Sequence, residues 1–97
     1  MLIVTEGAKK ELEKILYEKV DHPLAGIRLL SGVQPDNFGL AIDIEVSGDQ
    51  VVEHNGSKVL LIDCELSERL DGDILDVEDT ASGKSFVVLE RAEVRYG

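Results

Sequence analysis

Three residues of this sequence carry side chains that bind soft metals or act as nucleophiles: Cys64, His22 and His54. With a single cysteine, the chain has no intrachain disulfide and no Cys-x-x-Cys metal or redox motif. The two histidines lack the i, i+4 spacing that places a ligand pair on one face of a helix. We therefore predict no bound metal or other cofactor, and treat the three residues as weak candidates for a metal site.

The sequence around these three residues favours structural roles. Cys64 follows an apolar strand and begins a short helix, a position that can lower a thiol pKa and raise its reactivity. Free cysteines are nevertheless among the most buried residues, so we interpret Cys64 as a small packing side chain. His22 precedes Pro23 and His54 precedes a tight turn, so we expect both histidines to be exposed and to bind nothing.

Signatures of enzymes are absent from the sequence. It contains no Gly-x-Ser-x-Gly, no glycine-rich phosphate loop with a lysine and no His-Glu-x-x-His. Asp43 and Glu45 share one face of a predicted strand, but a calcium site needs about six to eight oxygens, so we expect a solvated face. Other carboxylate pairs, such as Asp76 with Glu78, follow from the 20 acidic residues in the chain. We predict a protein that is not an enzyme.

Length and charge narrow the class of protein. The 97 residues make one domain, spanning 1–97, which buries enough surface to fold without disulfides. The formal net charge of −10 opposes binding to nucleic acid or anionic membranes, because both begin with cationic side chains. The N-terminus lacks the basic and apolar regions of a signal peptide, and no apolar run reaches the ~20 residues of a membrane span. We therefore expect a cytoplasmic protein without nucleic acid or membrane partners.

The apolar periodicity predicts one long helix followed mainly by strands. Thr5 offers an N-cap hydroxyl, and apolar residues recur at helical spacing from Ala8 to Val20. This helix should end near Pro23. A short second helix fits residues 64–70. Strands are expected at residues 2–4, 25–30, 40–46, 50–54, 58–63, 74–78 and 85–90, with residues 91–97 forming an edge strand or fraying.

The composition of these strands predicts how they pack. Alternating apolar residues on one strand are expected to face the core: Leu40, Ile42, Ile44 and Val46. Continuous apolar runs at 59–62 and 86–89 suggest two strands covered on both faces. Asn55-Gly56 predicts a tight hairpin turn. Aromatic residues are only 4% of the chain, so the core must be aliphatic.

A turn-rich loop connects two of the predicted strands and consists of Val33, Gln34, Pro35, Asp36, Asn37 and Phe38. Flanking glycines permit positive φ, the proline fixes a bend, and the Asp-Asn pair can hydrogen-bond the local backbone. The loop carries no reactive side chain. We interpret it as a packing corner or an interaction loop.

The order of residues around this loop resembles the A-type iron-sulfur cluster carriers, the HesB-like family. The loop begins at Gly32 and ends in Phe38-Gly39-Leu40, and an alternating strand follows. The agreement runs from Thr5 to about Phe86 and includes Leu70-Asp71-Gly72. The resemblance implies an α+β, mostly β fold: a pseudobarrel or β-sandwich with one N-terminal helix and a short second helix. It also suggests a homo-oligomer.

The resemblance does not extend to the residues that hold the cluster. In the family, the residue after the first glycine of the loop is typically a ligating cysteine, and here it is Val33. A Cys-x-Cys pair near the C-terminus completes the family's set, yet residues 87–97 contain no cysteine. Because valine offers neither charge nor lone pair, this scaffold should not ligate a cluster in the family manner.

We therefore hypothesise a non-enzymatic HesB-like domain that acts as an accessory or protein-interaction module around iron-sulfur or metal handling. One alternative is an iron or iron-sulfur cluster carrier that uses Cys64, the histidines or carboxylates in an oligomer. Another is a small-molecule-binding β domain, which predicts a lined pocket and no effect of the cysteine.

Overall fold

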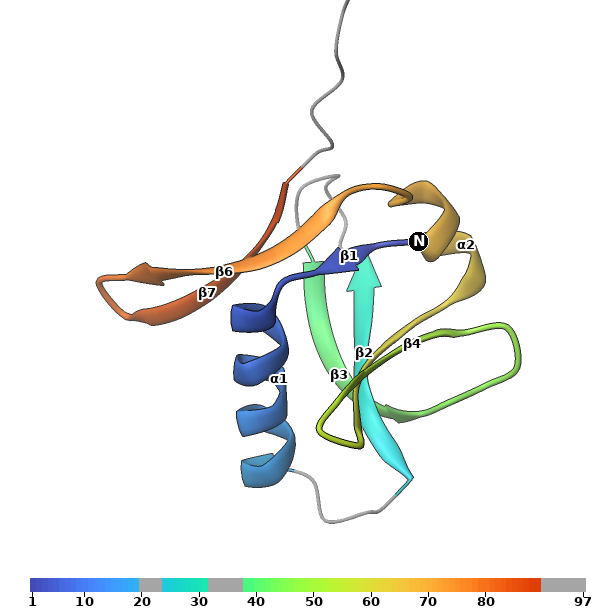
Figure 1. Ribbon diagram of the computed structural model, residues 1–97, viewed down its shortest axis with the longest axis horizontal. Coiled ribbons are helices and arrows are strands. Elements are labelled where there is room, and N and C mark those ends of the chain that lie inside the picture. Colours follow the sequence, from blue (N-terminus) through green and yellow to red (C-terminus); the bar gives the residue numbers. More distant parts are fainter. Residues whose placement is uncertain (20–23, 32–37, 90–97) are drawn as a thin grey trace, which may run out of the picture.

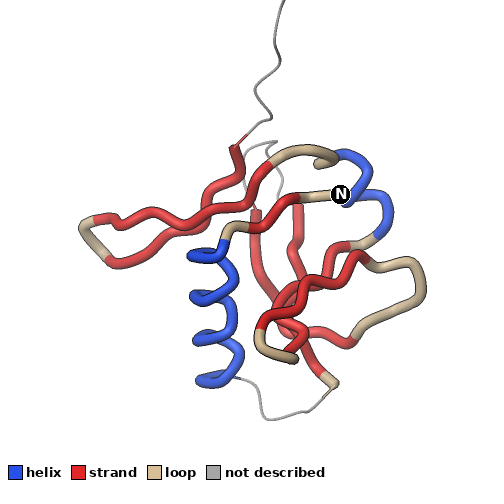
Figure 2. Tube along the Cα trace, in the orientation of Figure 1, coloured by secondary structure: helices blue, strands red, loops and turns tan. Residues whose placement is uncertain are grey.

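The computed structural model describes residues 1–19, 24–31 and 38–89, and within them the chain forms two helices and two β-sheets. Strands make up most of the described chain, and the long helix lies on one side (Figure 2). The elements in order are β1 Ile3–Val4, α1 Glu6–Lys19, β2 Ala25–Ser31, β3 Phe38–Ile44, β4 Gln50–His54, β5 Ser57–Ile62, α2 Cys64–Arg69, β6 Ile74–Thr80 and β7 Gly83–Leu89. The predicted α+β, mostly β fold is confirmed, including the short second helix.

The two sheets combine parallel and antiparallel pairs. One sheet has the order β3-β2-β5-β4, with β2 and β5 parallel, and the other has the order β1-β6-β7, with β1 and β6 parallel. Helix α1 packs against strands of both sheets, and the β6–β7 hairpin projects past the start of this helix (Figure 1). Neither helix is long and apolar enough to cross a membrane, within the part of the chain that the structure describes.

Local chemistry sets the beginning of α1. The hydroxyl oxygen of Thr5 accepts a hydrogen bond from the backbone N–H of Ala8 at 3.2 Å, as expected of an N-cap. The same hydroxyl donates to a carboxylate oxygen of Asp76 at 2.7 Å, which ties the helix start to β6. This hydrogen bond from Thr5, and then one from the backbone N–H of Val77, lower the pKa of the Asp76 carboxyl. Leu12 and Leu16 on the buried face confirm the predicted stripe. The predicted end of the helix near Pro23 lies outside the described residues.

The core is aliphatic, as the composition predicts. It has its centre at β5, where Val59, Leu60, Leu61 and Ile62 are completely buried. This confirms that β5 is covered on both faces. The hairpin before it turns at Asn55 and Gly56, both with positive φ, which matches the right-handed twist of the flanking strands.

Two packing predictions are wrong. Leu40, Ile42, Ile44 and Val46 were expected in the core, but all four are substantially exposed. They lie on or just beyond β3, an edge strand of its sheet, where α1 packs less closely than it does on β5. The run in β7 is not doubly covered either, because β7 is also an edge strand and its residues 86–88 are only half-buried.

Gly26 allows β2 and β5 to approach closely. A Cβ atom at this position would lie 3.0 Å from the carbonyl oxygen of Lys58 and 3.2 Å from Cγ of Leu61. Because the first of these atoms is backbone of the central strand, it has little freedom to move. The glycine is therefore required by packing and not by its φ angle.

Gly26→Ala should destabilise the fold by about 1 to 3 kcal/mol, since the added methyl group overpacks the contact between β2 and β5. The free energy of unfolding from urea denaturation measures this loss. Gly39→Ala is the matched control on the neighbouring strand, because the nearest atom to its new Cβ is 4.0 Å away. Equal stability of the two variants would contradict the packing argument.

Candidate functional site

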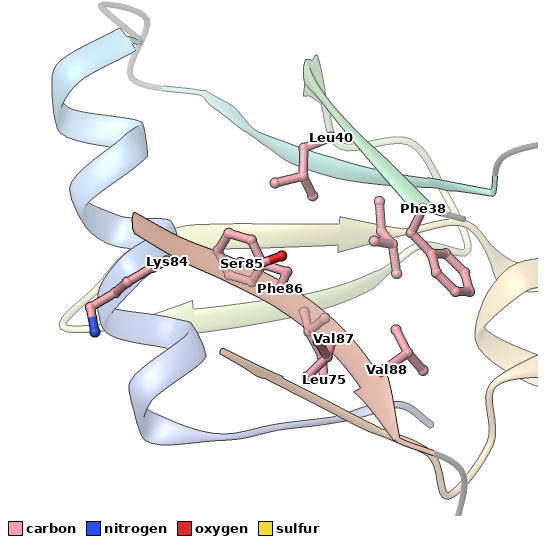
Figure 3. A pocket seen from close by; sticks show the side chains of 9 residues that line it. Phe38, Leu40, Leu75, Lys84, Ser85, Phe86, Val87 and Val88 are labelled. Carbon is pink, nitrogen blue, oxygen red and sulfur yellow. The ribbon is translucent and has the colours of Figure 1, made fainter. Parts of the chain in front are cut away.

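A cleft of about 540 Å³ lies between the two sheets, at the side where β3 and β7 face each other. Figure 3 shows Phe38 and Leu40 on the β3 side, with the β7 side chains across from them. The lining residues are Leu29, Phe38, Leu40, Leu75, Lys84, Ser85, Phe86, Val87 and Val88. A cleft of this volume is within the range of small-molecule and peptide-side-chain sites.

The strand pairing explains why this cleft is apolar. Leu40 lies opposite the buried Leu29 in the β2–β3 ladder, and Leu75 lies opposite Val88 in the β6–β7 ladder. Residues directly opposite each other in antiparallel strands share a face. Each sheet therefore presents an aliphatic face to the cleft, and Phe86 packs against the same core cluster.

The described lining residues are mostly apolar, with two polar side chains among them. The ammonium group of Lys84 is 2.7 Å from a carboxylate oxygen of Asp79. This hydrogen bond raises the pKa of Lys84, so it stays a cation at neutral pH. The only other polar side chain among the nine is the hydroxyl of Ser85, and no histidine, cysteine or carboxylate lies beside it in the lining. Among the described lining residues, none is a side chain that commonly acts as a base toward the Ser85 hydroxyl.

The last residue of the predicted interaction loop lines this cleft. Phe38, its last residue, begins β3, lines the cleft and packs partly against the core. Residues 33–37, which include Val33 at the position of the family's first cysteine, lie outside the described residues. Of the residues in the predicted loop, Phe38 is described by the structure, and its side chain lines the cleft.

Cys64 is exposed, so its interpretation as a buried packing residue is wrong. It begins α2, and its thiol lies 3.9 Å from a carboxylate oxygen of Glu68 one turn later. A short helix at the surface leaves the side chain of its first residue open to solvent, whatever the residue's intrinsic preference for burial. Cys64 is not among the residues that line the cleft.

His54 does not lie near Cys64. His54 ends β4, and its side chain is 13% exposed, so the prediction of an exposed histidine is wrong for this residue. Its Nδ1 lies 3.8 Å from a carboxylate oxygen of Glu6. His54 and Cys64 flank opposite ends of β5, roughly 20 Å apart at the usual rise of a strand. No group of three or more potential ligands forms within residues 1–19, 24–31 and 38–89, and His22 falls outside these ranges.

Arg28 is a feature that the sequence reasoning missed. It lies in the middle of β2 and is only 8% exposed. Its guanidinium donates twice to Asp49, at 2.8 and 3.0 Å, and once to Asp43, at 2.6 Å. A further bond of 3.2 Å reaches the carbonyl oxygen of Ile44. The available signal was a lone cation inside an apolar strand, because a buried charge must find partners.

These contacts keep all three groups charged. The bidentate pair with Asp49 moves the pKa of Arg28 further above its ordinary value. Hydrogen bonds from Arg28 lower the pKa of Asp49, whose side chain is 1% exposed. The pKa of Asp43 is lowered first by the backbone N–H of Ile44 and then by Arg28. The network therefore joins β2, β3 and the turn before β4.

The pairing of Asp43 and Glu45 argues against a cation site on this strand. Glu45 lies 2.8 Å from the ammonium of Lys58, and this contact raises the pKa of the lysine. Asp43 is bound to Arg28. Both carboxylates are exposed, as expected of a solvated face, and each also forms a salt bridge within the chain.

Comparison with solved structures identifies the architecture. Escherichia coli SufA, a protein involved in the biosynthesis of iron-sulfur clusters, superposes with a TM-score of 0.65 and 23% identity over 92% of this chain and 84% of SufA. IscA with the [2Fe-2S] cluster superposes with a TM-score of 0.61 and 19% identity over 93% of this chain and 85% of IscA. The chain has the fold of the A-type iron-sulfur carriers. No protein-family model and no curated protein matches the sequence.

This HesB-like fold confirms the predicted resemblance at the level of architecture. The chain nevertheless has one cysteine, and α2 holds it at the surface. The fold alone does not supply the three thiolates that the resemblance would require.

Asp49→Asn should lower the free energy of unfolding at pH 7 by roughly 2 to 4 kcal/mol, because it leaves the buried side of Arg28 without its bidentate partner. The folded-state pKa of Asp49 is lowered. Its contribution is therefore complete above the ordinary value of about 4 and is lost as the pH falls through the folded-state pKa. Urea denaturation across this acidic range measures both effects.

The control for this prediction is Asp79→Asn, which removes an exposed partner of Lys84 and should change stability little. The wild type should lose more stability on acidification than Asp49→Asn does. Parallel pH profiles for wild type and Asp49→Asn would show that the carboxylate does not carry this dependence.

Proposed function

We propose that this chain is a non-enzymatic HesB-like domain that keeps the carrier scaffold without the family's cluster ligands and acts as an accessory or protein-interaction module. The observation that carries the proposal is the SufA-like architecture over 92% of a chain with a single cysteine. The apolar cleft beside Phe38 supports the interaction role, because its described lining residues offer a mostly aliphatic binding surface.

The chemistry of iron-sulfur clusters supports the loss of ligation. Cysteine thiolates hold such clusters, usually four to one cluster. This chain supplies one thiol, Cys64, and two copies would supply two. His54 lies at the other end of β5, and the nearest carboxylate partner of Cys64 is Glu68. The set is too small and too dispersed for ligation in the family manner.

A second candidate, an iron or cluster carrier that uses Cys64 across an oligomer, gains support from the exposure of this thiol. Two exposed thiolates in a symmetric pair are a plausible half of a ligand set, and small external thiols can complete one. The two candidates differ in whether a cluster forms and whether its formation depends on Cys64.

Anaerobic reconstitution with ferrous iron and sulfide should yield no stoichiometric chromophore, since a single surface thiol cannot hold a cluster against competing thiols. Absorption spectra and iron and sulfide analysis after desalting measure this. Val33→Cys serves as a control variant, because one restored thiol still lacks the C-terminal pair and should also remain colourless. A stoichiometric cluster that is lost in Cys64→Ser would establish the second candidate instead.

The proposed interaction role predicts a direct complex with iron-sulfur assembly proteins. Titration with a purified cluster-loaded A-type carrier, followed by fluorescence anisotropy, should show saturable binding. Val33→Glu in the predicted interaction loop should weaken it about tenfold or more if the loop forms the contact. Ala81→Glu is the matched control, since it adds the same charge at the exposed turn between β6 and β7.

A third candidate, a small-molecule-binding domain, gains support from the volume and apolar lining of the cleft. Mass spectrometry of the organic extract from purified protein would reveal a co-purifying apolar molecule. Stoichiometric recovery of one compound from both wild type and Cys64→Ser would favour this candidate over the other two.

A further inference from the structure

An uncovered apolar row runs along β3. Leu40, Ile42 and Ile44 are 38%, 50% and 50% exposed, although they lie opposite the buried residues Leu29, Ile27 and Ala25 of β2. The row therefore continues the core face of the sheet. Helix α1 covers β5, β4 and β2, and no element of the described chain packs over β3 from that side to an equal extent. Large apolar side chains gathered on one strand in this way mark association sites.

The strand that carries this row is also a sheet edge. β3 is the first strand in the order β3-β2-β5-β4, so its second side pairs with no strand among the described residues (Figure 1). Natural edge strands usually carry charges or prolines that prevent pairing with another chain. β3 carries one charge, Asp43, and Arg28 of the neighbouring strand binds it at 2.6 Å. The edge is thus apolar, and its one charge is paired within a chain of net charge −10.

The order of residues in β3 is self-complementary about its central residue, Ala41. In an antiparallel pair of two such strands with the two copies of Ala41 opposite each other, Leu40 faces Ile42 and Phe38 faces Ile44 of the second copy. Gly39 then faces Asp43, so the single carboxylate meets the smallest side chain. Apolar residues meet apolar residues at each position of the row.

We infer that β3 is the interface between two copies of this chain, paired antiparallel about a two-fold axis at Ala41. The strand is used over its whole length, Phe38–Ile44, and the two Asp43 side chains lie four residues apart along the joined strands. A register centred on Ile42 would bring the two Asp43 side chains to diagonal positions and would leave Phe38 beyond the overlap with β3. Like charges at close cross-strand positions are destabilising, which favours the register at Ala41.

The pairing joins the two four-stranded sheets and places the second copy beside the cleft lined by Phe38 and Leu40. An isologous interface of this type is the commonest form of homodimer. The inference does not depend on the proposed function, because it uses only the edge strand, its exposed row and its charge pairs. A cluster carrier and a ligand-free module would dimerise through β3 in the same way.

Disulfide trapping tests the register. In a Cys64→Ser background, Ala41→Cys should form a covalent dimer under mild oxidation, because residues opposite each other across antiparallel strands lie within the Cα separation that a disulfide spans. Ile44→Cys in the same background is the control. Its two copies would lie roughly 20 Å apart, six residues along the joined strands, and should stay unlinked. Equal trapping of both variants, or of neither, would overturn the inference.

Sedimentation equilibrium tests the interface without a new thiol. Wild-type protein should show a concentration-dependent monomer–dimer equilibrium, and Ile42→Lys should raise its dissociation constant about tenfold or more. Ile3→Lys is the matched control: the same substitution at a residue 53% exposed, on β1 of the other sheet. It should leave the equilibrium unchanged, and circular dichroism checks that both variants fold.

Two outcomes of this experiment would contradict the inference. If the wild-type chain remains monomeric at all concentrations, β3 does not pair with a second copy, and its edge would instead be a site for a strand from a different protein. An equal loss of dimer in Ile42→Lys and Ile3→Lys would show that the added charge, and not its place on β3, causes the effect. Because the copies repel at a net charge of −10 each, added salt should strengthen the dimer.

Discussion

The complete burial of β5 is the constraint on which the other elements depend. Its four residues from Val59 to Ile62 have no exposed surface, so both faces of this strand must be covered. α1 packs on β5 and, across the core, Leu75 of β6 joins the same cluster. Beside β5, β2 approaches so closely that a Cβ at Gly26 would lie 3.0 Å from the carbonyl oxygen of Lys58 and 3.2 Å from Cγ of Leu61. Aliphatic burial thus fixes both the place of the helix and the spacing of the central strands.

Arg28 shows how polar contacts act on top of this packing. Arg28 is paired with Leu61 across β2 and β5, and its side chain lies on the face of the sheet away from α1. Its guanidinium group binds the carboxylates of Asp49 and Asp43. Asp49 also accepts a hydrogen bond from the backbone N–H of Val46 at 2.8 Å. The network therefore holds the turn after β3 and keeps this strand in the sheet. A buried charge pair adds geometric definition more than net stability.

The open side of the molecule is where function is expected. The cleft between β3 and β7 and the apolar row of β3 are adjacent, with Leu40 belonging to both. Both lie where each sheet ends in an edge strand, β3 or β7, which the single long helix contacts less than it contacts β5 and β6. The proposed interaction role and the inferred two-fold pairing of β3 both use this surface.

The sequence by itself determined most of the secondary structure, and its resemblance to the A-type carriers implied the architecture. Thr5 as an N-cap, the helical stripe through Leu12 and Leu16, the Asn55-Gly56 turn and the buried run in β5 depend on local chemistry and periodicity, which act over a few residues. The absence of the family's cysteines was also visible in the sequence. Only the tertiary structure decided which apolar faces are covered, why Arg28 is buried, and that Cys64 and His54 lie apart. Alternation specifies the face on which Ile42 lies, whereas its burial depends on whether another element reaches that face, and here α1 packs on β5 and leaves the edge strand open.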